Sequence, residues 1–406
     1  MAIDQWLGAA RLGGRAAASF ARVATDAVGA RFGRGLPDTK QAVATPEVMN
    51  DLFQNHAPRG QPPLPLVTSV KLSGVDFESS NCINFLVDLE FAEGDNHLPK
   101  TAYVKLPCAE TWTRSFANTL GFWSLECLFC DRVAPHMPIR VPLVYAVAQQ
   151  GTRFVLVMEN LYEAVDARMF INRDMAAGTT PERAERVLRA FAEMHAHFWD
   201  WSKADREALL PEAFNTYTAP SQRGVTPMLN AAALHPARKA APDLVSQELV
   251  DTCRLALGKW DAVLDGWYNG PLTLVHGDSH LGNCFEYPTD EGLRVGMIDF
   301  QAVHWSKGMR DVQYFLINSL DPEVLEENEE TLIRGYCAEL ARHGATLSFE
   351  DAYDQFRAFS YQSLMVGIVP LGLAALTERD ETVLALTRRA AIAVERLGFR
   401  DWVEGL

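Results

Sequence analysis

The stretch LVHGDSHLGN, residues 274–283, sets an aspartate and an asparagine five residues apart directly after an apolar run. The sequence that follows, CFEY, PTDEG and LRVGMIDF, is typical of two short strands joined by a polar turn, with Asp299 near the end of the second strand. Neighbouring strands bring such positions together. We therefore expect Asp278, Asn283 and Asp299 to converge at one end of this hairpin.

These three side chains present oxygen atoms. Carboxylate and amide oxygens suit a hard cation such as Mg2+, which takes few protein ligands and leaves the remaining positions to phosphate and water. An additional acid beside such an ion can orient a hydroxyl and accept its proton in phosphoryl transfer. The alternative is a hairpin whose polar residues only cap its turns. For any one residue alone that simpler interpretation is preferred, but the set in this order favours a metal-dependent site.

Two further charged residues lie in apolar surroundings earlier in the chain. Lys105 interrupts the strand-like segment TAYVKLP, and Glu126 lies on the apolar stripe of a helix predicted over residues 118–134. A buried charge is costly unless it is paired, so the two residues can neutralise each other. The alternatives are a lysine that reaches the surface and a glutamate at a helix end.

The composition is that of a globular protein. The chain has 406 residues, of which 48% are hydrophobic and 22% charged, enough for two or three structural units. Its formal net charge of -15 argues against general nucleic-acid binding, because phosphate backbones attract basic surfaces.

The cysteines indicate a reducing compartment. Seven scattered cysteines do not form the framework of a disulfide-rich secreted protein, so we expect free thiols and a cytoplasmic location. Cys127 and Cys130 form a lone C-x-x-C pair, for which core packing is preferred over a zinc site. The longest apolar run, residues 364–376, contains glycine and proline and is too short to cross a bilayer.

The N-terminal segment is rich in alanine and carries arginines at positions 11, 15, 22, 31 and 34. This pattern predicts a helical extension over residues 1–40 that packs on the body of the protein or on a partner chain. A transit-like segment, or an amphipathic helix that makes weak contact with an anionic membrane, remains an alternative.

The rest of the chain divides by pattern. Residues 41–160 contain a short helix with Thr45 as its cap, then alternating strands, an inserted helix and a hairpin. Residues 161–406 are mainly helical, with Thr179 or Thr180 capping a helix that begins at Pro181. The prediction is an α+β protein with a small antiparallel sheet lobe and a larger helical lobe.

Six motifs together resemble the aminoglycoside phosphotransferase and choline kinase superfamily, and within it the ecdysteroid-kinase-like branch. They are HGDSHLGN, VGMIDFQ, GMRDVQYFL, YVKL, SLECLF and EMHAHFW, and they span roughly residues 40–400. The aspartate-to-asparagine signature joined to the second aspartate is the specific part of this match. The resemblance implies a two-lobed protein-kinase-like fold that uses ATP and Mg2+.

The resemblance also implies individual roles. Asp278 would be the catalytic base or the acid that orients the hydroxyl, and Asn283 and Asp299 would be the Mg2+ ligands. Lys105, positioned by Glu126, would hold phosphate oxygens.

Other positions follow from the same match. Ser79 and Ser80 would meet the triphosphate, and Glu159 and Leu161, in the hinge VMENL, would contact adenine through their main chain. His276 would shape the catalytic loop, and Asp311 would anchor that loop.

The sequence departs from protein kinases in informative ways. It lacks a G-x-G-x-x-G loop, has Gly277 in place of the arginine before the catalytic aspartate, and has Phe300 and Gln301 after the metal aspartate. These departures favour a small-molecule kinase without a phosphorylation switch. His195 lies on an apolar stripe and is interpreted as a hydrogen-bonded core histidine, whereas His280 is left open between loop packing and substrate contact.

The expected activity is transfer of the γ-phosphate of ATP to a hydroxyl of a small molecule. A lipophilic, sterol-like alcohol is ranked ahead of an aminoglycoside as the acceptor. The alternative from a different class is a catalytically silent kinase-like protein that binds a metabolite or a partner.

Overall fold

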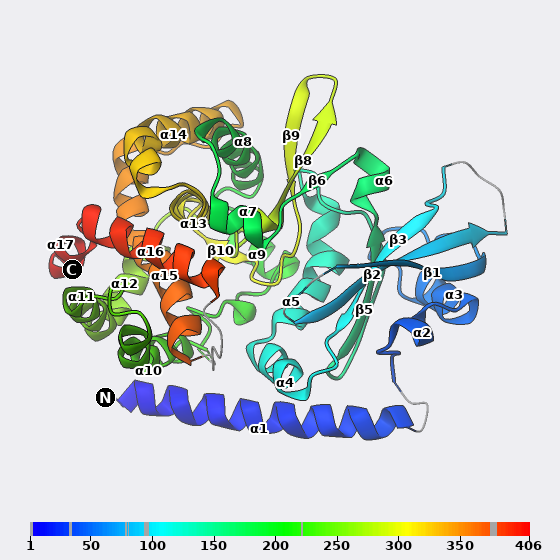
Figure 1. Cartoon of the computed structure of the whole chain (residues 1–406). Coiled ribbons are helices and arrows are strands. Elements are labelled where there is room, and N and C mark those ends of the chain that lie inside the picture. Colours follow the sequence, from blue (N-terminus) through cyan, green and yellow to red (C-terminus); the bar gives the residue numbers. More distant parts are fainter. Residues whose placement is uncertain are drawn as a thin grey trace. The chain divides into compact units, whose positions relative to one another are not determined.

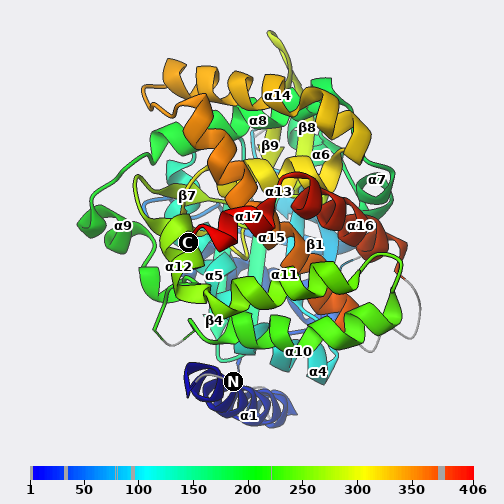
Figure 2. The same cartoon turned by 90° about the vertical axis from the view of Figure 1, so that its left-hand side faces the viewer.

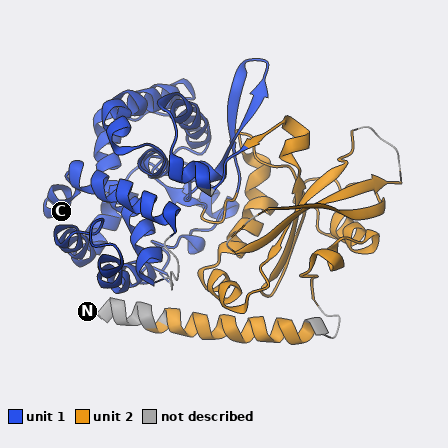
Figure 3. Ribbon diagram, in the orientation of Figure 1, with its two compact units in different colours: residues 1–9, 169–298, 303–406 blue, residues 10–168, 299–302 orange. Residues whose placement is uncertain are grey.

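The computed structural model describes residues 3–31, 35–77, 79, 81–92, 97–220, 222–373 and 380–406. The chain forms two compact units, coloured separately in Figure 3. The sheet unit comprises residues 10–168 and 299–302, and the helical unit comprises residues 1–9, 169–298 and 303–406. The predicted combination of a small antiparallel sheet with a larger, mostly helical part is confirmed.

The sheet unit is built on a five-stranded antiparallel sheet with the strand order β1-β2-β3-β5-β4 (Figure 1). The strands are β1 (Val67–Phe77), β2 (Cys82–Phe91), β3 (Thr101–Pro107), β4 (Val144–Gln150) and β5 (Arg153–Glu159). The register pairs Asn84 with Lys105 and Lys105 with Leu156. Lys105 therefore lies in the middle of the sheet.

One face of the sheet packs on the short helix α3 (Pro46–Asn55). Thr45 caps this helix as predicted, because its Oγ1 accepts a hydrogen bond from Val48 N at 3.3 Å. Met49 and Phe53 of the helix are fully buried together with Phe85 and Val104 of the strands. Burial of each such side chain is worth roughly 1.5–3 kcal/mol.

The helix predicted over residues 118–134 is two helices. Helix α4 (Thr111–Leu120) ends at Gly121, and α5 (Phe122–Leu128) continues into a π-helical turn (Phe129–Val133) and a 3-10 turn (Ala134–His136). Gly121 has φ 81°, a left-handed conformation that ends a helix and that glycine adopts without a steric penalty. Only residues 118–120 of the predicted helix precede this break, and the apolar stripe from Phe122 to Val133 lies after it.

Helix α1 (Ile3–Arg31) packs on the sheet unit through its described residues from Ala10 onward. Ser19 Oγ donates to the Ser115 carbonyl at 2.8 Å, and Asn118 Nδ2 donates to Ser19 Oγ at 2.8 Å. The Asp26 carboxylate accepts from Thr152 N at 2.7 Å and from Thr152 Oγ1 at 2.6 Å. The predicted helical extension thus contacts α4 and the turn between β4 and β5.

The helical unit is visible in Figure 2. Its α-helices are α7 (Asn172–Ala177), α8 (Pro181–His197), α9 (Lys203–Leu209), α10 (Val225–Ala240), α11 (Gln247–Gly258), α12 (Trp260–Tyr268), α13 (Met309–Ser319), α14 (Pro322–Arg342), α15 (Phe349–Leu373), α16 (Glu381–Arg396) and α17 (Phe399–Glu404). Helix α8 is capped by Thr180, whose Oγ1 accepts from Arg183 N at 3.4 Å. Within the described segments, no helix combines the length and the apolar character needed to cross a membrane.

Two short strand pairs lie among these helices. The predicted hairpin is formed by β8 (Cys284–Thr289) and β9 (Gly292–Met297), which pair antiparallel. Strand β7 (Thr273–Val275) pairs antiparallel with β10 (His304–Ser306). Strand β10 was not predicted from the sequence. A three-residue strand carries too few residues to show an alternating pattern.

Candidate active site

The loop that follows β7 is held by Asp311, the third residue of α13. Asp311 Oδ2 accepts from His276 N at 2.6 Å, and Oδ1 accepts from Gly277 N at 3.0 Å. The same residue's carbonyl accepts from Ser279 Oγ at 3.1 Å. His195 is completely buried beside Asp311, with its Nε2 3.3 Å from Oδ2, which agrees with its interpretation as a core histidine. Asp311 therefore fixes the loop backbone on both sides of Gly277.

The ring of His276 also shapes this loop. Its Nε2 donates to the Ile298 carbonyl at 2.8 Å, and its Nδ1 accepts from Asp278 N at 3.2 Å. These two bonds require one neutral tautomer, with the proton on Nε2. Gly277 has φ 83°, a conformation that an arginine at this position would adopt only with strain.

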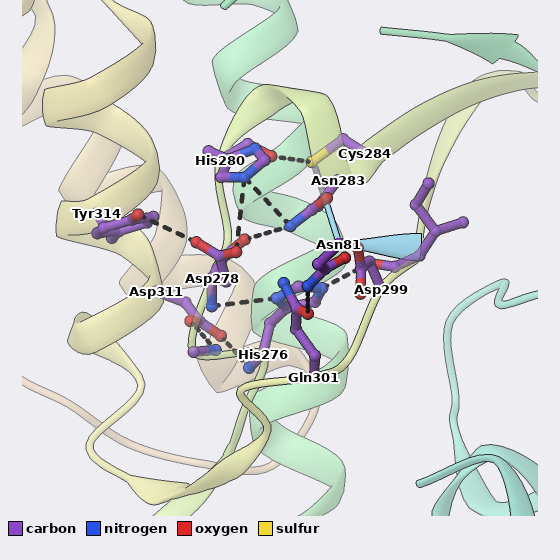
Figure 4. Close-up of polar contacts among 12 residues, drawn as sticks. Asn81, His276, Asp278, His280, Asn283, Cys284, Asp299, Gln301, Asp311 and Tyr314 are labelled. Carbon is purple, nitrogen blue, oxygen red and sulfur yellow. Dashed lines mark hydrogen bonds and ion pairs between the residues drawn. The ribbon is translucent and has the colours of Figure 1, made fainter. Parts of the chain in front are cut away.

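Asp278 and Asn283 lie together in the loop (Figure 4). Asn283 is 6% exposed, and its Nδ2 donates to the Asp278 carbonyl at 2.8 Å. Because the amide nitrogen is used inside the loop, the amide oxygen is the atom left for a ligand. The Asp278 carboxylate is partly buried; its Oδ1 accepts from Tyr314 Oη at 3.0 Å, and its Oδ2 lies 3.6 Å from His280 Nε2.

Asp278 remains ionised in this environment. Burial disfavours its charge, but the neighbouring His280 and the hydrogen bond from Tyr314 outweigh that cost, so the pKa of Asp278 lies well below its usual range. An ionised carboxylate can accept a hydrogen bond from a hydroxyl and orient it. It is therefore a chemically suitable partner for an acceptor alcohol.

The sheet unit brings together Lys105, Glu126 and Asp299. Lys105 Nζ lies 2.6 Å from Glu126 Oε1 and 3.2 Å from Asp299 Oδ1. Lys105 and Glu126 are both 4% exposed, so this is a buried ion pair rather than a surface contact. The alternative of a lysine that reaches the surface is therefore wrong, and Glu126 is buried although it lies in the last turn of α5.

The charges of this cluster are coupled. Burial opposes the charge on Lys105, but Asp299 and Glu126 outweigh it and raise the pKa of the ammonium well above its ordinary value. Burial raises the pKa of Glu126 to about 7, although Lys105 counteracts it. The ammonium thus stays charged between one partly exposed and one buried carboxyl group.

Residues 299–302 are attached to the sheet unit by three consecutive side chains. Asp299 contacts Lys105, the Phe300 ring stacks on Phe129 with 3.8 Å between ring centres, and Gln301 Oε1 accepts from Asn81 Nδ2 at 3.2 Å. Asp299 has φ 62°, an uncommon conformation for a residue other than glycine. Such strain is typical of functional positions, and here it occurs where the chain passes from the helical unit into the sheet unit.

Of the phosphate-binding serines predicted from the resemblance, Ser79 is exposed, and its hydroxyl lies 3.5 Å from Asn81 Oδ1. Ser80 lies outside the described residues.

The hinge residues have different surroundings. Glu159 ends β5, where its carboxylate accepts from Arg140 Nη2 at 2.6 Å and its N–H donates to the Leu143 carbonyl at 2.8 Å. Leu161 is the first residue of α6 (Leu161–Val165), so its N–H has no acceptor within the helix.

A family model identifies the protein family to which this chain belongs. The model of the ecdysteroid kinase-like family matches residues 87–349. The chain belongs to this family. The match covers β3, α5 and the loop around Asp278, which carry the charged clusters. A comparison with curated proteins finds no match.

Solved structures similar to this ecdysteroid kinase-like protein come from several kinases. One is described as an aminoglycoside phosphotransferase from Ralstonia eutropha, with 15% identity, a TM-score of 0.49, and coverage of 88% of this chain and 98% of that chain. Another is an ethanolamine kinase from Plasmodium vivax, with 10% identity, a TM-score of 0.47, and coverage of 80% and 82%. A choline kinase from Streptococcus pneumoniae has 12% identity, a TM-score of 0.43, and coverage of 81% and 94%.

Three residues beside these clusters of the ecdysteroid kinase-like chain were not identified from its sequence. Asn84 is 7% exposed and pairs in register with Lys105; Arg310 and Tyr314 lie on α13 beside Asp311. The spacing of three residues between Asp311 and Tyr314 places both on one face of a helix and could have identified the tyrosine. Asn84 gives no such signal, because it occupies an ordinary position in an alternating strand.

Proposed function

We propose that this ecdysteroid kinase-like protein transfers the γ-phosphate of ATP to a hydroxyl of a small molecule. The observation that carries the proposal is the Lys105 ammonium held between Glu126 and Asp299. A pair of this kind organises nucleotide phosphates in kinases. A sheet does not need it for stability, because a buried ion pair contributes less than well-packed apolar side chains of the same volume.

The donor set fits Mg2+. Asn283 offers an amide oxygen, Asp299 offers a carboxylate, and hard cations of this size prefer such oxygens. Within the described ranges, no cluster of three or more histidine, cysteine, aspartate or glutamate side chains has the arrangement of a complete metal site. Asn283 and Asp299 would hold a metal ion that takes further ligands from the phosphates of the nucleotide. When bound, it would neutralise charge on the phosphates.

The remaining roles follow from the chemistry of each side chain. Lys105 would contact phosphate oxygens, and Glu126 would keep its ammonium in place. Asp278 would orient the acceptor hydroxyl and take the proton that this hydroxyl loses when its oxygen bonds to phosphorus. Leu161 N–H and the Glu159 carbonyl would contact adenine, and Ser79 and Ser80 would meet the triphosphate.

The acceptor class rests on the family. A lipophilic, sterol-like alcohol is the preferred acceptor, and an aminoglycoside is the second candidate. Catalysis would come mainly from positioning and from stabilisation of charge, since phosphoryl transfer needs little covalent chemistry from the protein.

The test is consumption of ATP by the purified full chain in the presence of hydroxylated compounds, with phosphorylated product identified by mass. Asp278→Asn should lower turnover by at least about a hundredfold while ATP still binds, because this variant removes the proton acceptor alone. A protein that binds ATP and Mg2+ yet phosphorylates neither sterol-like alcohols nor aminoglycosides would support the silent binding protein instead.

A further inference from the structure

Tyr314 and Arg310 form a brace behind Asp278. Tyr314 is 1% exposed, and its hydroxyl donates to Asp278 Oδ1 at 3.0 Å. Burial and the charge of Asp278 raise the pKa of Tyr314 well above its ordinary value, so the hydroxyl keeps its proton and acts as a donor. A hydrogen bond to a charged acceptor is stronger than one between neutral groups.

Arg310 supports this tyrosine and the loop together. Its guanidinium carbon lies 4.8 Å from the centre of the Tyr314 ring, and its Nη2 donates to the Gly277 carbonyl at 2.7 Å. Arg310 and Tyr314 are one helical turn apart on α13, which places both side chains on the same face. The guanidinium therefore touches both neighbours of the Asp278 carboxylate: the ring that donates to it and the residue before it in the loop.

The surroundings of Arg310 differ from those of the other buried arginines. Arg114 and Arg153 pair with Asp38, and Arg389 pairs with Asp321. Among the described residues, no carboxylate forms an ion pair with Arg310, although it is only 2% exposed. Desolvating a guanidinium without a carboxylate is costly, and its contacts with the ring and one carbonyl offset only part of that cost. A purely structural role would be met at lower cost by an apolar side chain.

The geometry points to Tyr314 and Arg310 as positioning residues that hold Asp278 by Oδ1 and leave Oδ2 to face the acceptor hydroxyl. This inference rests on the proposed function. Oδ2 makes a longer contact of 3.6 Å with His280 Nε2. Oδ2 then takes the acceptor proton as the O–H bond breaks, the acceptor oxygen bonds to the γ-phosphorus, and the bond from that phosphorus to ADP breaks.

The first test compares Tyr314→Phe with the wild-type full chain. We expect kcat to fall by about tenfold or more with little change in KM for ATP, which is the loss typical of one hydrogen bond to a charged group. The hydrogen bond from Tyr314 lowers the pKa of Asp278 in the wild type, so its loss should raise that pKa. The acid limb of the kcat pH profile should therefore move to higher pH. Arg310→Lys should retain more activity than Arg310→Met. An unchanged pH profile and kcat in Tyr314→Phe would overturn the proposal.

Tyr336→Phe is the matched control. Tyr336 is also 1% exposed, and its hydroxyl lies 2.9 Å from His195 Nδ1, so it supports the loop region without touching Asp278. This variant should lose stability yet keep the wild-type pH profile. If it moves the acid limb as far as Tyr314→Phe does, the role of Tyr314 is merely structural.

A second test needs no turnover. Urea unfolding of Tyr314→Phe, Asp278→Asn and the double variant should give non-additive losses of stability, because the two side chains share one hydrogen bond. Additive losses would show that Tyr314 does not hold Asp278, even if the protein is an active kinase. Non-additive losses in a protein that transfers no phosphate would keep the brace and refute the proposed function.

Discussion

Asp299 Oδ1 lies 3.2 Å from Lys105 Nζ, although 194 residues separate the two in sequence. The contact makes Asp299 part of the sheet unit, whereas Ile298, the residue before it, belongs to the helical unit. The strained backbone of Asp299 therefore turns its carboxylate toward the ammonium that Glu126 also holds. A residue proposed to bind a metal is thus already positioned by the residue proposed to bind phosphate.

Glu126 gives this cluster a pH dependence. Its pKa in the folded protein, about 7, exceeds the ordinary value of 4.5, chiefly because it is buried. The folded state therefore holds a proton that the unfolded state releases between these values, so this residue's contribution to stability is lost as pH rises through that window. The unfolding free energy of wild type relative to Glu126→Gln should fall between pH 4.5 and about 7, measured by urea unfolding. A difference that grows with pH would contradict this assignment.

Asp311 should be important for stability. It is completely buried and accepts hydrogen bonds from two consecutive loop N–H groups. Asp311→Asn removes the charge and turns one acceptor into a donor that faces those N–H groups, so we expect a loss of about 3–5 kcal/mol. Thermal or urea unfolding measures it, with the exposed Asp354→Asn as the control. Equal stability of the two variants would show that the loop does not depend on Asp311.

The N-terminal helix should stabilise the sheet unit. Asp26 accepts two hydrogen bonds from Thr152, whereas the hydroxyl of its neighbour Thr25 donates within the helix, to the Ala21 carbonyl. Asp26→Ala should therefore lower the unfolding free energy by about 1–3 kcal/mol, and Thr25→Ala by less than about 0.5 kcal/mol. Similar small losses in both variants would mean that α1 is not anchored at this point.

Vesicle binding that is unchanged after removal of residues 1–35 would separately exclude the membrane role.

The pair of charged residues in the sheet unit could be predicted from the sequence, whereas the residues that position Asp278 could not. Lys105 and Glu126 stand out because a charge in an apolar pattern needs a partner, and the structure supplies that partner. Tyr314 and Arg310 are less visible, since α13 is buried on all sides and its pattern does not distinguish a loop contact from core packing. The break at Gly121 is hard to recognise from the sequence because a single glycine is tolerated within a helical pattern.

The most direct test of the proposed nucleotide and metal site is a thermal-shift titration of the full chain with ATP, with Mg2+, and with both. We expect the midpoint to rise substantially only when both ligands are present. Asp299→Asn should reduce that rise, while Asp354→Asn should leave it unchanged. The absence of a shift with millimolar ATP and Mg2+, or a full wild-type shift in Asp299→Asn, would contradict the proposed nucleotide and metal site.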